Sequence, residues 1–305
     1  MTYMARVFAA MLIAGALLLA GCVAPGSASA GASGLNIVTS VYPFQFVAER
    51  IGGARTTVLN LTQPGAEPHD LELTPKQVGS VSAADLIIYL KGFQTAVDQA
   101  VEQSGNNNAL DVTTVVPLEA TADGAHHQET EPDPHVWLDP TRLAVIATAV
   151  ADRLAAADPA GAGEYRANAD RLRAELGLLD QDFRSGLTGC QRTAFITSHA
   201  AFGYLANRYR LTQIAITGLS PDAEPSPARI AAIQREAGEY GVTTIFTETL
   251  ASPAVAEAIA GDLGLRTDVL DPIEGLTPDS RGEHYLAVMR ANLAALEKAN
   301  GGPRA

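Results

Sequence analysis

The sequence predicts an α/β protein with two similar lobes, each built on a parallel-leaning sheet, joined by one long helix. Three observations support this fold class. Short apolar runs alternate with helical patterns along most of the chain, as in βαβ units. The run Asp85–Leu90 is continuously apolar after its first residue, which is typical of a strand buried on both faces. A helical pattern near Ala160–Leu187 separates the two alternating regions and would extend about 42 Å.

Length and composition suit a globular protein with two domains. The chain has 305 residues, of which 47% are hydrophobic and 18% charged, and domains commonly contain roughly 100–200 residues. The formal net charge of -13 repels nucleic acids and attracts cations. We therefore expect no nucleic-acid partner, and we expect a monomer.

The N-terminal segment has the pattern of an export signal. A short basic start is followed by the apolar run Val7–Ala20, which is shorter than the roughly 20 residues of a membrane span. Its end, Leu19-Ala20-Gly21-Cys22, resembles a bacterial lipoprotein signal. The resemblance implies removal of the signal peptide 1–22, lipid modification of Cys22 and an extracytoplasmic location on the cell membrane. A plain secreted protein or an uncleaved anchor remains the alternative.

A flexible tether and an N-terminal lobe follow this signal. Residues 23–34 are mostly small and cannot bury enough apolar area to fold. The lobe is expected over 35–158, with a polar, acidic loop at 119–134. Within it we expect strands at Asn36–Ser40, Thr56–Leu61 and Asp85–Leu90, and helices at Pro43–Ile51, from Pro75, at Phe93–Val101 and from Pro140 to Ala157.

The linking helix is expected within 159–188 and the C-terminal lobe over 189–300. This lobe repeats the α/β pattern without a sequence repeat. We expect strands at Thr193–Thr197, Gln213–Thr217, Val242–Thr247 and Arg266–Leu270, and helices at Ala201–Tyr209, Pro227–Tyr240, Pro253–Leu263 and His284–Ala299. Cys190 has no expected partner within the chain, and we assign it no function.

Four side chains in the loops of the two lobes are candidate metal ligands. His69 and His135 lie in the first lobe, while His199 and Asp271 each follow a strand in the second. Ligands of open α/β sheets bind outside the carboxyl ends of the strands. Three imidazoles and one carboxylate suit tetrahedral zinc. Spacing alone does not show that the four converge, so caps, turn hydrogen bonds and surface positions remain alternatives.

Four segments resemble the zinc- and manganese-binding receptors of ABC importers. They are Gly65–Pro75, Asp133–Pro140, Thr197–Leu205 and Gly218–Ser226, and the resemblance extends from Asn36 to Leu296. It implies two lobes joined by a helix, with a metal bound between them by His69, His135, His199 and Asp271. It also implies an ABC permease and its ATPase as partners.

The resemblance favours Zn²⁺ as the transported ion. The third ligand tends to be His in zinc receptors and Glu in manganese receptors, and here it is His199. A carboxylate at that position would harden the site toward Mn²⁺. A Mn²⁺ or Fe²⁺ receptor of the same family remains an alternative.

Several further residues are candidates for supporting roles. Glu224 and Glu248 could accept hydrogen bonds from metal-bound histidines, although capping or surface salt bridges are the alternative. His126 and His127 form a short histidine pair in the acidic loop and could gather zinc weakly, although a disordered surface loop explains them equally well. Glu67 is a weak ligand candidate, since Pro68 stands where some zinc receptors have Glu directly before the first ligand. Arg210 replaces the glycine that usually follows Tyr209 in the family.

Other classes of protein are less consistent with the sequence. A zinc-dependent hydrolase keeps an open coordination position for water, which four protein ligands would fill. Ser198 and His199 are adjacent and cannot simply face each other, and neither G-x-S-x-G nor a Walker A motif is present. We therefore expect no enzyme. Surface adhesion is a label that related proteins have carried, and nothing in the sequence identifies a host partner.

Overall fold

The computed structural model describes residues 34–120 and 132–302, which belong to one compact unit. The signal, most of the tether, Cys22, His126 and His127 lie outside the described residues. One group of strands comprises β1 (Leu35–Thr39), β2 (Thr56–Asn60), β3 (Leu86–Tyr89) and β4 (Ala109–Asp111). The other comprises β5 (Ala194–Thr197), β6 (Thr212–Ala215), β7 (Thr244–Thr247) and β8 (Arg266–Val269).

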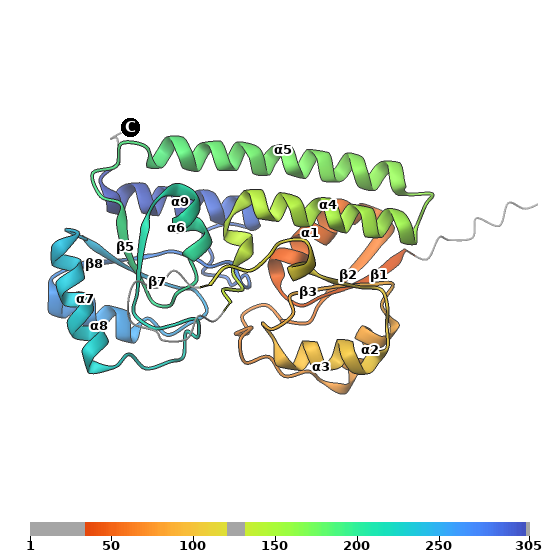
Figure 1. Ribbon diagram of the computed structural model, residues 1–305, viewed down its shortest axis with the longest axis horizontal. Coiled ribbons are helices and arrows are strands. Elements are labelled where there is room, and N and C mark those ends of the chain that lie inside the picture. Colours follow the sequence, from red (N-terminus) through yellow and green to blue (C-terminus); the bar gives the residue numbers. More distant parts are fainter. Residues whose placement is uncertain (1–33, 121–131, 303–305) are drawn as a thin grey trace, which may run out of the picture. The chain divides into compact units, whose positions relative to one another are not determined.

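The strands form two separate sheets (Figure 1). Each sheet has four strands, in the orders β2-β1-β3-β4 and β6-β5-β7-β8. Every pairing between these strands is parallel. The predicted α/β fold class with two parallel sheets is therefore confirmed. Strand β4 was not predicted, because three residues are too few for a strand pattern to be recognised.

Helices follow the strands in both halves. They are α1 (Tyr42–Gly52), α2 (Pro75–Ala83), α3 (Thr95–Ser104), α4 (Pro140–Ala157), α5 (Ala162–Leu187), α6 (Gly203–Tyr209), α7 (Pro227–Glu239), α8 (Ala254–Leu263) and α9 (Tyr285–Asn300), with short 3₁₀ turns at Gly53–Arg55, Val112–Thr114 and Val136–Leu138. The predicted starts at Pro75, Pro140 and Pro227 are confirmed. Each proline is preceded by a Thr, Asp or Ser whose side chain caps the first turn.

Helix α5 contacts elements of both halves. It packs on α1 and α4 of the first half and on α9 of the second, as Figure 1 shows. Its buried face contains the predicted apolar positions Tyr165, Leu172, Leu176, Leu179 and Phe183. These residues belong to one apolar core that also includes Ile37 and Leu86 of the first sheet and Phe195 and Phe246 of the second.

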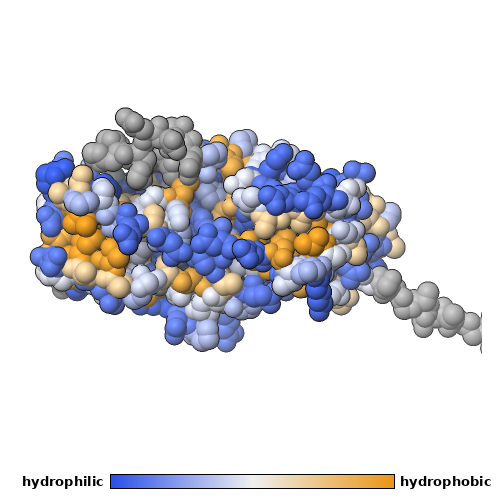
Figure 2. Space-filling view, turned by 90° about the horizontal axis from the view of Figure 1, so that it is seen from below, coloured by the Kyte–Doolittle hydropathy of each residue, from blue (hydrophilic) through white to orange (hydrophobic). Residues whose placement is uncertain are grey.

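The surface away from α5 is mixed in polarity. Figure 2 shows hydrophilic residues across the middle of this face and separate hydrophobic patches on either side of them. None of the described helices has the length and hydropathy that crossing a membrane would require.

Candidate metal centre

The three predicted histidines meet at the carboxyl ends of the two sheets. His69 lies in the loop that follows β2, His135 directly precedes the 3₁₀ turn Val136–Leu138, and His199 follows β5 by two residues. Their ring centroids are 5.3 Å (His135–His199), 5.7 Å (His69–His135) and 5.9 Å (His69–His199) apart. Residues 130 positions apart in the chain are thus brought to one point by the ends of parallel strands, as expected for an α/β crevice.

The carboxylate in this group belongs to Glu274. Its Oε1 lies 2.8 Å from Nε2 of His135, 3.1 Å from Nε2 of His69 and 3.8 Å from Nε2 of His199. One ligand atom from each of these four residues lies within 4.8 Å of all the others. Around a tetrahedral zinc ion with bonds of about 2.0–2.1 Å, ligand atoms stand about 3.3 Å apart. The four side chains therefore need only small shifts to surround one ion.

Asp271, which we predicted as the fourth ligand, is not part of this group. Its carboxylate is buried and accepts hydrogen bonds from the Ile273 amide (2.8 Å), the Thr249 hydroxyl (3.1 Å) and the Ser280 hydroxyl (3.0 Å). Burial is the main cause that raises the pKa of this carboxyl above its usual value. Asp271 and Glu274 both lie in the loop after β8, and the structure brings Glu274, not Asp271, to the histidines.

Carboxylates outside the group orient two of the three histidines. Asp133 Oδ1 faces both the backbone N–H (2.9 Å) and Nδ1 (2.8 Å) of His135. Glu248 Oε1 faces the corresponding atoms of His199 at 3.2 and 2.8 Å. In a neutral imidazole, a carboxylate at Nδ1 keeps the proton on that nitrogen, so that the lone pair of Nε2 is available to a metal ion.

The structure thus places Glu248 where a supporting residue was predicted, but not Glu224. Glu224 is exposed and lines a separate small hollow with Thr217 and Val255. Asp133 was missed, although it lies two residues before His135 in a Pro-containing segment that favours such a local bond. An Asp at that spacing from a histidine ligand is the signal that could have found it.

The histidines and carboxylates of the group shift one another's pKa values. Burial alone would lower the pKa of His199 and His135, but carboxylates outweigh it and raise both pKa values. For His199 these carboxylates are Glu248 and Glu274, and the rise is large. Burial alone would raise the pKa of Glu274, yet its contacts with the histidines hold that pKa well below the usual value.

A buried nitrogen of His199 further supports a metal ion at this group. Nε2 of His199 is fully buried and has no hydrogen-bond partner among the described residues. A buried polar atom without a partner is costly. Because this nitrogen faces Glu274 and the other two imidazoles, a cation bound there would supply the missing partner.

Glu67 lies at the edge of the group and is not one of its four members. Its carboxylate accepts the backbone N–H of His69 at 3.1 Å. Burial and the nearby Glu274 raise the pKa of Glu67 to about 7. It therefore supports the loop of His69.

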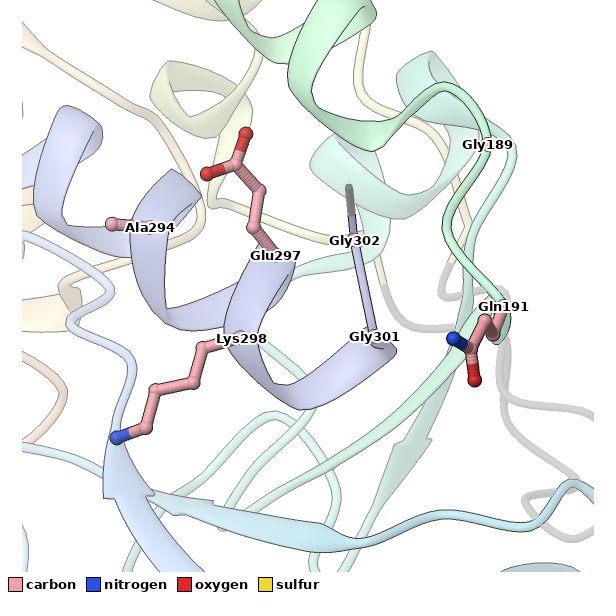
Figure 3. Close-up of a pocket in the computed structure, with 7 residues that line it drawn as sticks. All are labelled: Gly189, Gln191, Ala294, Glu297, Lys298, Gly301 and Gly302. Carbon is pink, nitrogen blue, oxygen red and sulfur yellow. The ribbon is translucent and has the colours of Figure 1, made fainter. Parts of the chain in front are cut away.

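A separate surface hollow lies at the C-terminal end of α9. It is lined by Gly189, Gln191, Ala294, Glu297, Lys298, Gly301 and Gly302 (Figure 3). Among the described residues that line it, Glu297 and Lys298 are charged and none is a histidine. This hollow therefore has no resemblance to the metal centre.

Comparison with known proteins gives consistent relatives. The chain is 35% identical over 286 residues to the zinc-binding lipoprotein AdcA of Streptococcus pneumoniae, covering 87% of this chain and 55% of AdcA. It is 33% identical over 297 residues to the high-affinity zinc uptake system protein ZnuA of Bacillus subtilis, covering 92% of this chain and 93% of that protein. The chain thus spans about half the length of AdcA and nearly all of ZnuA.

A solved structure agrees with these sequence matches. The Zn(II)-bound ZnuA-like domain of Streptococcus pneumoniae AdcA superposes with a TM-score of 0.73 at 34% identity, over 88% of this chain and 99% of that domain. The sequence profile of a family described as zinc-uptake complex component A, periplasmic, matches residues 37–299. The chain therefore belongs to this ZnuA family of zinc-uptake components.

Proposed function

We propose that this protein is the extracytoplasmic receptor of an ABC importer that captures Zn²⁺ through His69, His135, His199 and Glu274. One observation carries the proposal. Four ligand atoms from loops of both halves lie within 4.8 Å of one another, with three of the four side chains buried. The names of the relatives, which describe zinc binding and zinc uptake, support the same function.

Zinc is favoured by the donor atoms. Three neutral imidazoles and one carboxylate leave a bound Zn²⁺ with a formal charge of +1 and suit its tetrahedral geometry. Mn²⁺ prefers more oxygen ligands and a higher coordination number. Because the third ligand is His199 and not a carboxylate, we infer that the site selects zinc.

The proposed partners are a permease and its ATPase in the same membrane. The tether 23–34 and a lipid on Cys22 would keep the receptor near that membrane and still let it reach the permease. We propose that the receptor acts as a monomer and as a binding protein. Four protein ligands fill a tetrahedral shell and leave no open position at which zinc could activate water.

Metal stoichiometry and thermal melting test this function. We expect one zinc per chain and a higher melting temperature with zinc, because a ligand that binds only the folded state stabilises it. His199→Ala should abolish most of this gain. The exposed Glu224→Ala is the matched control and should behave as the unchanged protein. Absence of stoichiometric zinc, or equal losses in both variants, would contradict the proposal.

A further inference from the structure

The turn that carries Glu274 has an unusual backbone. Ile273, which directly precedes Glu274, has a φ of 61° and is completely buried. β-Branched residues rarely occupy this left-handed region, because their Cβ crowds the backbone. Such a conformation persists only where the surrounding structure imposes it.

The side chain of Asp271 ties this turn to two other segments. Its Oδ1 accepts the Ile273 N–H at 2.8 Å, which closes the turn from within. Its Oδ2 accepts the hydroxyls of Thr249 and Ser280 at 3.1 and 3.0 Å. Thr249 follows β7, and Ser280 lies in the loop before α9. One carboxylate thus joins three chain segments around the turn.

The backbone of the same turn is held from both halves of the protein. Asn292 of α9 accepts the Asp271 N–H at 2.9 Å and donates to the Asp271 carbonyl at 2.7 Å. Trp137 Nε1 donates to the Pro272 carbonyl at 2.8 Å. Trp137 lies two residues after His135, so this bond fixes the position of the turn relative to His135. Glu274, two residues after Pro272, is 1% exposed and lies among the three imidazoles.

We propose that Asp271 is a positioning residue that locks the left-handed turn at Ile273 and thereby holds Glu274 in place before zinc arrives. This inference rests on the proposed zinc site and assigns Asp271 a role other than that of a ligand. If the backbone of Glu274 is fixed, its carboxylate can offer the ion only one oxygen in one position. Such a ligand favours a four-coordinate ion. A carboxylate free to swing could bind through both oxygens or admit water, as Mn²⁺ prefers. Asp271 thus sets metal preference through Glu274.

Variants of Asp271 test the proposal by metal binding and by spectroscopy. Asp271→Ala removes all three bonds and should weaken zinc binding by about 10–100-fold, as is usual when a residue that orients a ligand is lost. The ratio of zinc to manganese affinity should fall. The visible absorption of bound Co²⁺, which is intense in tetrahedral sites, should weaken. Asp271→Asn keeps an oxygen for the Ile273 N–H and should recover part of each effect.

A double-mutant cycle shows whether Asp271 acts through Glu274. The loss caused by Asp271→Ala should largely disappear when Glu274→Gln is already present, because the residue that it positions no longer binds as a carboxylate. An undiminished loss in that background would overturn the proposal. If Asp271→Ala does not fold, Ser280→Ala removes a single bond to the same carboxylate. Ser280→Ala should lower the ratio of zinc to manganese affinity by a smaller factor than Asp271→Ala. An unchanged ratio would count against the proposal.

A matched control separates positioning from general stability. Asn168→Ala removes a buried hydrogen bond to the Ile51 carbonyl, which involves α5 and α1 and none of the four ligands. It should lower the melting temperature without changing the metal ratio or the Co²⁺ spectrum. If Asp271→Ala gives this same result, Asp271 is only structural. If the unchanged protein does not bind zinc, the proposed function itself fails, which is a distinguishable outcome.

Discussion

The three histidines of the candidate metal centre have two kinds of environment. His135 and His199 are fully buried, and each has a carboxylate at Nδ1. The side chain of His69 is 14% exposed and packs edge-on against Phe93, with ring centroids 4.9 Å apart. The first two imidazoles are thus oriented by carboxylates, and His69 is the most exposed of the three proposed histidine ligands.

The raised pKa values predict a pH-dependent zinc affinity. Carboxylates raise the pKa of His135 and His199 above the ordinary value of 6.5, and zinc must displace these protons to bind. Affinity should therefore decrease as the pH falls, starting above pH 6.5. Competition with a chelator between pH 8.5 and about 6 measures this. A constant affinity over that range would show that the imidazoles are already deprotonated.

The same shifts predict the opposite trend in the metal-free protein. A folded-state pKa above the unfolded value contributes stability that is fully present below about pH 6.5 and is lost as the pH rises through the raised value. The melting temperature without zinc should thus decline as the pH rises above this point. The difference between the melting temperatures with and without zinc should therefore grow as the pH rises. Melting curves at several pH values test both trends.

At the scale of elements, the end of α6 contains a strained residue. Arg210 caps this helix with φ 58° and ψ 42°, a left-handed conformation in which glycine is preferred. Its N–H and that of Leu211 both donate to the Ala206 carbonyl, so the conformation ends the helix and begins the connection to β6. The arginine side chain is exposed.

Arg210→Gly should therefore stabilise the protein. Relief of the left-handed strain is worth about 1–2 kcal/mol, and the greater freedom of glycine in the unfolded chain offsets about 0.5–1 kcal/mol of it. We expect a net gain of about 0.5–1 kcal/mol in the free energy of unfolding, measured with urea. Arg166→Gly, an exposed position inside α5, is the control and should cost about 1 kcal/mol. Equal losses in both variants would argue against strain at Arg210.

At the scale of the whole folded unit, the two sheets share a core. Ile37 and Leu86 of the first sheet and Phe195 and Phe246 of the second belong to the same cluster of buried residues. Leu176 of α5 lies in it as well. Because neither sheet has this core to itself, loss of one half exposes apolar surface of the other.

The metal-free protein should consequently unfold in a single cooperative transition. Far-UV circular dichroism reports on both halves, and the single tryptophan, Trp137, reports on their junction through its bond to Pro272. The two signals should change at the same denaturant concentration. Different denaturation midpoints for the two signals would mean that the halves unfold independently. The shared core would then not couple their unfolding.

The sequence by itself was sufficient for the features that depend on local interactions. Continuous apolar runs such as that of β3, and the Thr, Asp and Ser caps before Pro75, Pro140 and Pro227, predicted most elements within a few residues. Periodicity and capping are properties of neighbouring residues, so they are visible without the fold. The resemblance of four segments also singled out the three histidines that the structure brings together.

Only the tertiary structure decided which acid joins those histidines. Asp271 and Glu274 lie in one loop, and the sequence places the first directly after β8, where a ligand is expected. The left-handed turn at Ile273 reverses this order by turning Asp271 toward Thr249 and Ser280 and Glu274 toward the imidazoles. No glycine marks that turn. The turn is held by the bond from the Ile273 N–H to Asp271 and by bonds from Trp137 and Asn292. Trp137 and Asn292 are distant in the chain and near the turn only in the folded protein.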